Sequence, residues 1–168
     1  MVTSHHYSAQ DLSSLLRGIE KELPFLLALS EEKVLVRPGG PGSWSPKEEL
    51  GHLIDSAANN HMRFVRGALE ASYAGPGYAQ NAWVQIHGYQ EMPWEWLVNF
   101  WLQYNVMLAG LIGRIAPERL ETPCVIGGGA PVTLGFVIED YILHMQHHVD
   151  HILGREVITE YPSRSVAV

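Results

Sequence analysis

The segment that begins at Pro93 spaces its apolar side chains alternately three and four residues apart. This spacing places all of them on one face of an α-helix, and it is typical of a bundle helix that packs against its neighbours at a shallow angle. The segment therefore predicts a long helix with one buried face. Its apolar positions are Trp94, Leu97, Trp101, Tyr104, Leu108, Leu111 and Ile115.

Three other segments combine a helix-start signal with helical apolar spacing. A serine or threonine opens each of them, and its side chain can accept a hydrogen bond from a free backbone N–H group of the first turn. Pro24 either kinks the first of these helices or begins another turn. Loops rich in proline and glycine separate the segments, with a short extended piece expected at 124–126. The expected helices are 8–23, 45–73 and 133–154.

Four long helices without alternating strands predict an all-α four-helix bundle. The hydrophobic fraction of 46% and the charged fraction of 17% are those of a folded globular chain. A length of 168 residues suits one domain with one core, so we expect a single domain over 1–168.

Charge and composition exclude several classes of partner. The net charge is −7 and no basic patch is present, so a nucleic acid is not an expected partner. We expect no signal peptide, because the first twenty residues lack a cationic start followed by an apolar run. No apolar stretch is long enough to cross a membrane. The only cysteine, Cys124, fits a reducing compartment, so we expect a cytoplasmic protein.

Histidines are concentrated in the sequence EDYILHMQHHVDHIL, which carries His144, His147, His148 and His151. At about 100° per residue, His144 and His148 lie beside the apolar stripe of this helix, whereas His151 and His147 lie progressively farther from it. Two imidazoles four residues apart can chelate one metal ion. By spacing alone His147 and His151 form a rival pair, and a solvated polar face is the simplest alternative.

A third metal ligand has to come from elsewhere, and the candidates are His52, His61 and His87. His61 lies within the apolar stripe of the 45–73 helix, where it could be a hydrogen-bonded core histidine. His52 lies in a polar row with Ser56, Asn59 and Arg63, which either faces solvent or lines a cleft. The pattern alone does not choose between them.

Two motifs resemble those of the DinB/YfiT-like superfamily: SWSPKEELGHLIDSAANNHMRF and YILHMQHHVDHI. The resemblance covers roughly residues 12–154 and implies a four-helix bundle in which three histidines hold a divalent metal at one end of a cleft. On the matching positions these ligands are His52, His144 and His148. His151 stands where relatives often have glutamine. It is therefore a secondary candidate, either for a fourth ligand or for a partner of the ligands.

Three neutral imidazoles leave at least one metal position open, which is the layout of a catalytic site rather than a closed structural one. Imidazole ligands suit several ions, and we expect zinc or nickel, with iron as a further option. The resemblance implies either transfer of a low-molecular-weight thiol or metal-dependent hydrolysis of a small molecule. A bundle that binds metal or a small ligand without turnover is the alternative, and a bundle used only for assembly is a third class.

The sequence names no catalytic residue. Asp55, Glu49, Asp140 and His147 are all possible proton acceptors, and none has a distinguishing signal. The pair Glu49 and His52 matches the Glu-x-x-His unit of di-iron bundles, but the second copy that such sites need is missing. The resemblance and the surplus of tryptophan predict a homodimer formed through helix faces.

Overall fold

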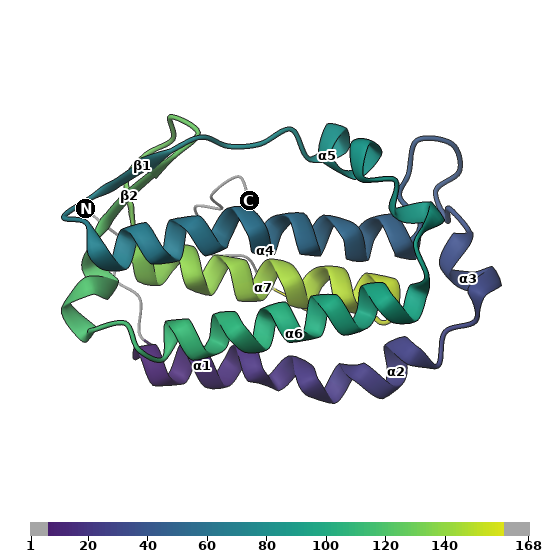
Figure 1. The fold of residues 1–168 in the computed structure, drawn as a ribbon, viewed down its shortest axis with the longest axis horizontal. Coiled ribbons are helices and arrows are strands. Elements are labelled where there is room, and N and C mark those ends of the chain that lie inside the picture. Colours follow the sequence, from purple (N-terminus) through teal and green to yellow (C-terminus); the bar gives the residue numbers. More distant parts are fainter. Residues whose placement is uncertain (1–6, 160–168) are drawn as a thin grey trace.

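The computed structural model describes residues 7–159, which form a bundle of four long helical segments (Figure 1). This architecture confirms the predicted all-α four-helix bundle. The first segment is composite, because α1 continues through a 3₁₀ stretch into α2. The helices are α1 (Ala9–Arg17), α2 (Leu23–Leu27), α3 (Glu31–Leu35), α4 (Pro46–Leu69), α5 (Gln80–His87), α6 (Trp94–Ile112) and α7 (Leu134–Ile152). The 3₁₀ stretches are Gly18–Glu22, Tyr89–Glu91 and Pro117–Glu121.

The four long segments enclose one core. Helix α6 lies between α1 and α4, α4 packs along α7, and α7 closes the ring by packing on α1. Apolar side chains from all four meet inside, which buries them from water. Fully buried core residues include Leu12, Leu16, Leu50, Phe64, Leu97, Trp101, Leu108, Ile138 and Tyr141.

Helix starts follow the capping signals in the sequence. The Ser8 and Ser45 hydroxyls accept hydrogen bonds from backbone N–H groups three residues later, at 3.1 and 3.2 Å. Thr133 does the same for Phe136 at 3.1 Å. Pro24 stands in the first turn of α2, where its missing N–H group costs nothing, so the proline begins a new turn. The expected 8–23 helix is therefore interrupted after Arg17.

A small three-stranded sheet lies at the end of the bundle opposite α3 (Figure 1). Its strands are β1 (Tyr73–Gly75), β2 (Pro123–Ile126) and β3 (Val132–Thr133). Strand β2 pairs in parallel with β1 and antiparallel with β3, so Cys124 lies between Tyr73 and Val132. The expected extended piece at 124–126 is confirmed as β2.

The sheet also corrects a helix boundary. Because Tyr73 pairs in β1, α4 ends at Leu69 rather than near Tyr73. Strands β1 and β3 and the short helices α3 and α5 were not predicted. Within residues 7–159, no helix is both long and apolar enough to span a membrane.

Candidate metal centre

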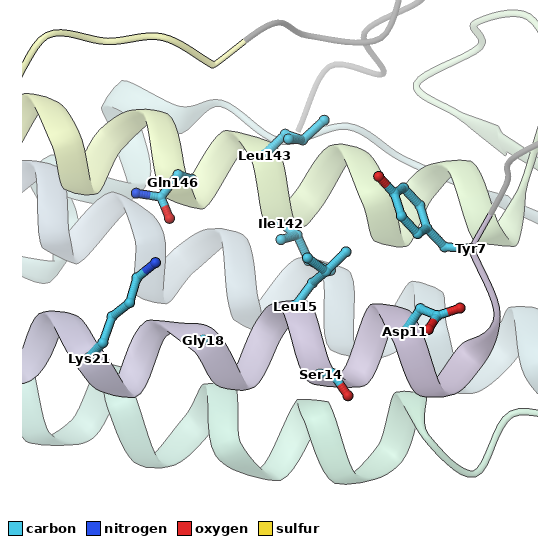
Figure 2. Close-up of a pocket in the computed structure, with 9 residues that line it drawn as sticks. All are labelled: Tyr7, Asp11, Ser14, Leu15, Gly18, Lys21, Ile142, Leu143 and Gln146. Atoms are coloured by element: carbon cyan, nitrogen blue, oxygen red, sulfur yellow. The ribbon is translucent and has the colours of Figure 1, made fainter.

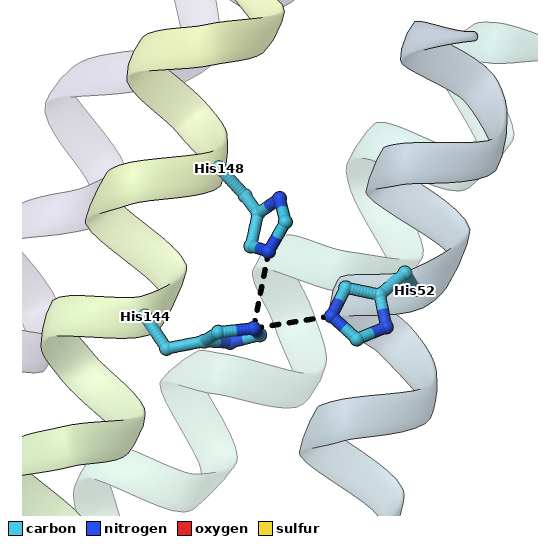
Figure 3. Close-up of side chains that lie close together, drawn as sticks. All are labelled: His52, His144 and His148. Carbon is cyan, nitrogen blue, oxygen red and sulfur yellow. Dashed lines mark hydrogen bonds between the residues drawn. The ribbon is translucent and has the colours of Figure 1, made fainter. Parts of the chain in front are cut away.

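Three histidine rings from two helices converge between α4 and α7 (Figure 3). His52 comes from the second turn of α4, and His144 and His148 come from successive turns of α7. The Nε2 atom of His144 lies 3.1 Å from Nε2 of His52 and 3.1 Å from Nε2 of His148. One nitrogen from each ring lies within 4.8 Å of the others, so the structure brings together the three histidines singled out in the sequence.

The cluster lies at the edge of the core. His52 is 1% exposed, His144 8%, and the His148 side chain 17%. Ser56 and Arg63, from the polar row of His52, are also buried. This row therefore faces the inside of the bundle, which settles the alternative that the sequence left open for His52.

Burial keeps two of the rings neutral. Burial, together with a smaller effect of neighbouring His148, lowers the pKa of His52 from 6.5 to about 3. Burial is also the main cause that lowers the pKa of His144 from 6.5 to about 2, with the three other histidines around it adding to the effect. Neutral imidazole keeps a lone pair on one ring nitrogen, which is the form that binds metals.

The donor set fits a divalent ion. A tetrahedral zinc about 2.0–2.1 Å from each nitrogen requires separations between the nitrogens of about 3.3 Å, close to the two observed distances of 3.1 Å. A single proton on the central Nε2 cannot satisfy both neighbouring nitrogens with good geometry, whereas one cation can attract all three lone pairs. His52, His144 and His148 would therefore hold such an ion through Nε2.

A loop covers one side of the cluster. The Trp44 ring lies 4.7 Å from the His52 ring and 6.5 Å from the His148 ring, measured between centroids. Gly40 and Gly42 precede it with φ angles of 79° and 96°, which favour glycine and let the loop turn back over α4. Trp44 thus shields His52 from solvent.

A cavity of about 390 Å³ lies beside His148, between the Trp44 loop and α7. Of the three converging histidines only His148 lines this cavity, together with the further histidines His147 and His151. A small molecule could approach the cluster from here. The lining consists of Pro38, Gly39, Ser43, Trp44, Glu49, His147, His148 and His151.

Glu49 and His151 flank the cluster without belonging to it. The His148 Nδ1 atom lies 2.7 Å from Oε1 of Glu49, on the side of the ring away from the other two histidines. His151 Nδ1 lies 2.8 Å from each Glu49 oxygen. His151 thus contacts a neighbour of a candidate ligand. Neither His147 nor His151 is part of the converging group, so the rival pair is not assembled.

The remaining sequence candidates lie elsewhere. His61 is half-buried and its Nδ1 lies 3.2 Å from the Tyr104 hydroxyl, so it is hydrogen-bonded but not fully in the core. His87 is 44% exposed and contacts Asp55, which also accepts a hydrogen bond from Tyr89. Asp140 is buried and does not line the cavity.

Another hollow, of about 530 Å³, lies between α1 and α7 (Figure 2). Leu15, Ile142 and Leu143 contribute its apolar part, and Asp11 of α1 and Lys21 of the 3₁₀ stretch that follows lie at its two ends. None of the three converging histidines lines it. This hollow is therefore separate from the histidine cluster.

Comparison with known proteins gives consistent matches. A curated relative from Oceanobacillus iheyensis, named "Putative metal-dependent hydrolase", is 22% identical over 66% of this chain and 64% of its own length. A relative of the same name from Bacillus mycoides is 21% identical over 82% of this chain and 79% of its own. The solved structure of YfiT from Bacillus subtilis, a four-helix bundle, has a TM-score of 0.79 at 16% identity and covers 92% of this chain and 90% of its own. The family model of the DinB superfamily matches residues 15–152, and the chain belongs to that superfamily.

Proposed function

We propose that the protein is a metal-dependent hydrolase that acts on a small molecule. The observation that carries this proposal is the convergence of three histidine Nε2 atoms beside an open cavity. His52, His144 and His148 would hold one divalent ion, zinc or nickel with iron as a further option. The names of the two curated relatives support hydrolysis.

Each part of the site has a role in this proposal. A bound ion of this type makes a water ligand more acidic and polarises a carbonyl oxygen. His52, His144 and His148 would supply three of the ligands of such an ion, and a further ligand position would be available to water or substrate. Trp44 shields His52 from solvent, and the cavity beside His148 would admit the substrate. A low-molecular-weight thiol could occupy the same position as a thiolate, which makes thiol transfer the second reaction to test.

The test is a panel of chromogenic esters and amides together with thiol-conjugation assays. Each assay is run on protein as purified, after chelation, and after addition of one equivalent of zinc or nickel. We expect at least one activity that chelation removes and one metal equivalent restores. Stoichiometric metal without any metal-dependent turnover would instead support a bundle that binds metal or a small ligand without catalysis.

We also propose a homodimer that forms through the outer face of α6. Trp96 is 52% exposed, Phe100 42% and Met107 49%, and these residues lie along one side of the helix with half-buried Tyr104. The Trp96 and Phe100 rings stack at 5.2 Å with an angle of 8°. An exposed, contiguous aromatic surface is typical of protein interfaces.

We propose in addition that the protein is cytoplasmic. The buried free thiol of Cys124 supports this location, because free thiols persist in a reducing compartment.

Light scattering at micromolar concentration should give twice the chain mass of 18.8 kDa. Replacing both Trp96 and Phe100 with glutamate should give monomers, because buried like charges oppose association. Ile86→Glu is the matched control, since Ile86 is 83% exposed on α5, away from this face. A wild-type protein that is monomeric throughout would contradict the proposed dimer.

A further inference from the structure

We infer that Glu49 is a positioning residue of the metal centre, held in place by His151. In this inference, which builds on the metal site of the proposed function, Glu49 fixes which nitrogen of His148 carries the proton. Neither Glu49 nor His151 would bind the ion. Both would determine how firmly His148 binds the ion.

Two residues of α4 lie beside the His148 ring. Glu49 and His52 are three residues apart, so their side chains leave α4 on the same face. His52 lies on the Nε2 side of His148, with ring centroids 4.9 Å apart. Glu49 lies on the other side, with Oε1 2.7 Å from Nδ1. The Glu-x-x-His pair of α4 therefore supplies one member of the histidine cluster and one hydrogen-bond partner of another member, rather than two ligands to one ion.

His151 completes the surroundings of the Glu49 carboxylate. It lies one turn after His148 on α7, and its Nδ1 atom is 2.8 Å from both carboxylate oxygens. The Glu49 side chain is only 6% exposed, whereas that of His151 is 58% exposed at the mouth of the cavity. A buried carboxylate needs such donors to offset its lost hydration. Two N–H donors from one helix therefore fix its orientation.

The consequence for His148 follows from imidazole chemistry. A neutral ring carries one proton, and donating it from Nδ1 to a carboxylate leaves the lone pair on Nε2. That lone pair then points toward the other two histidines. Without the carboxylate, part of the population would carry the proton on Nε2, which blocks that nitrogen as a ligand. Carboxylate partners also make a ligating imidazole more basic.

Glu49 has no counterpart at the other two rings. The Nδ1 atoms of His52 and His144 are buried and have no hydrogen-bond partner within residues 7–159. His148 is thus the one ring of the cluster whose protonated nitrogen is defined by a contact in the described chain. Changes at Glu49 should therefore act on the metal centre through His148.

The first test reads the tautomer directly, in metal-free protein. Long-range proton–nitrogen spectra of histidine-labelled protein at pH 8 should show His148 protonated on Nδ1. In Glu49→Ala, a substantial fraction of the molecules should carry the His148 proton on Nε2. In Glu49→Gln this fraction should be smaller, because the amide oxygen of glutamine can still accept a hydrogen bond from Nδ1. Glu32→Gln on exposed α3 should leave the spectrum unchanged. The same Nδ1 tautomer in wild type and Glu49→Ala would overturn the inference.

The second test measures zinc affinity by competition with a chromophoric chelator. Glu49→Ala should weaken binding about 10–100-fold, and His151→Ala should weaken it by less than about tenfold. Cobalt-loaded Glu49→Ala should also show a shifted visible spectrum, which a purely structural residue would not produce. Unchanged affinity and spectrum in Glu49→Ala would overturn the inference.

These readouts separate the inference from the proposed hydrolase. A wild-type protein that binds zinc tightly but hydrolyses nothing contradicts the hydrolase and leaves the affinity ratio measurable. A wild-type protein that binds no zinc contradicts both the metal site and the role of Glu49 in it. Circular dichroism of each variant confirms that the bundle is folded.

Discussion

His148→Ala should abolish stoichiometric zinc or nickel binding while the bundle stays folded. Two imidazoles hold a divalent ion far less firmly than three, because each lost ligand removes one of only three protein contacts. His52→Ala and His144→Ala should have the same effect, since their Nε2 atoms join the same cluster. Replacing His148 should affect metal content much more than stability, because its ring is partly exposed at the cavity.

Two other histidines provide matched controls. His147→Ala should keep its metal, because His147 lines the cavity but is outside the converging group. His61→Ala should also keep it and should lose about 1 kcal/mol of stability, since the hydrogen bond to Tyr104 disappears. Because His61 is half-buried, this loss of stability is smaller than the loss expected from replacing a fully buried core ring.

The measurement is metal content by elemental analysis after dialysis, with circular dichroism and urea unfolding for each variant. The decisive comparison is His147→Ala against His148→Ala. Loss of metal in His147→Ala with retention in His148→Ala would show that the ligand set is wrong.

The sequence predicted the parts of the fold that depend on local signals. Ser8, Ser45 and Thr133 cap helices because a hydroxyl at that position satisfies a free backbone N–H group regardless of what packs nearby. Helix α6 follows from its apolar spacing, which needs only a core on one side. The proximity of His144 and His148 follows likewise from four-residue spacing on one helix.

The parts that depend on another segment were not predictable from local pattern. His52 lies in a polar row, and only the packing of α7 against α4 shows that the row faces inward. The position of His52 in the candidate site therefore came from the family resemblance. Strand β1 exists because Tyr73 pairs with Cys124, far away in sequence. The contact between Glu49 and His148 also joins two helices, although the spacing of Glu49 and His52 was a usable signal.

Arg63→Met should destabilise the protein by about 1–3 kcal/mol, because it removes the donor from buried hydrogen-bond acceptors. Arg63 is 1% exposed and donates hydrogen bonds to the Asn60 side chain at 3.2 Å and to the Pro76 carbonyl at 3.5 Å. It also interacts electrostatically with Asp140 of α7. Methionine fills similar space but satisfies none of these groups, so a buried carboxylate loses its nearby cation. Urea unfolding at pH 7 measures the change.

Asp140→Asn should act in the opposite direction and should depend on pH. Burial raises the pKa of Asp140 from 3.8 to about 7, although Arg63 opposes the shift. A carboxyl whose folded pKa lies above its unfolded value destabilises the fold increasingly as pH rises from about 4 to about 7, and by a constant amount above that. Asparagine removes this ionisation. The variant should therefore be more stable than wild type at pH 8, by an amount on the order of 2 kcal/mol, and close to wild type at pH 4.

Combining the two substitutions tests whether they act on one interaction. If the main cost of Arg63→Met is the uncompensated Asp140 carboxylate, the double variant should be more stable than Arg63→Met alone, and the effects should be non-additive by more than about 0.5 kcal/mol. Strict additivity would mean that Arg63 stabilises the bundle mainly through Asn60 and Pro76, by anchoring the chain after α4. Asp140 lies one turn before His144 on α7 but is not part of the converging group, so zinc content of the folded Asp140→Asn variant should equal that of wild type. A loss of zinc there would show that the polar cluster and the metal centre are one coupled unit.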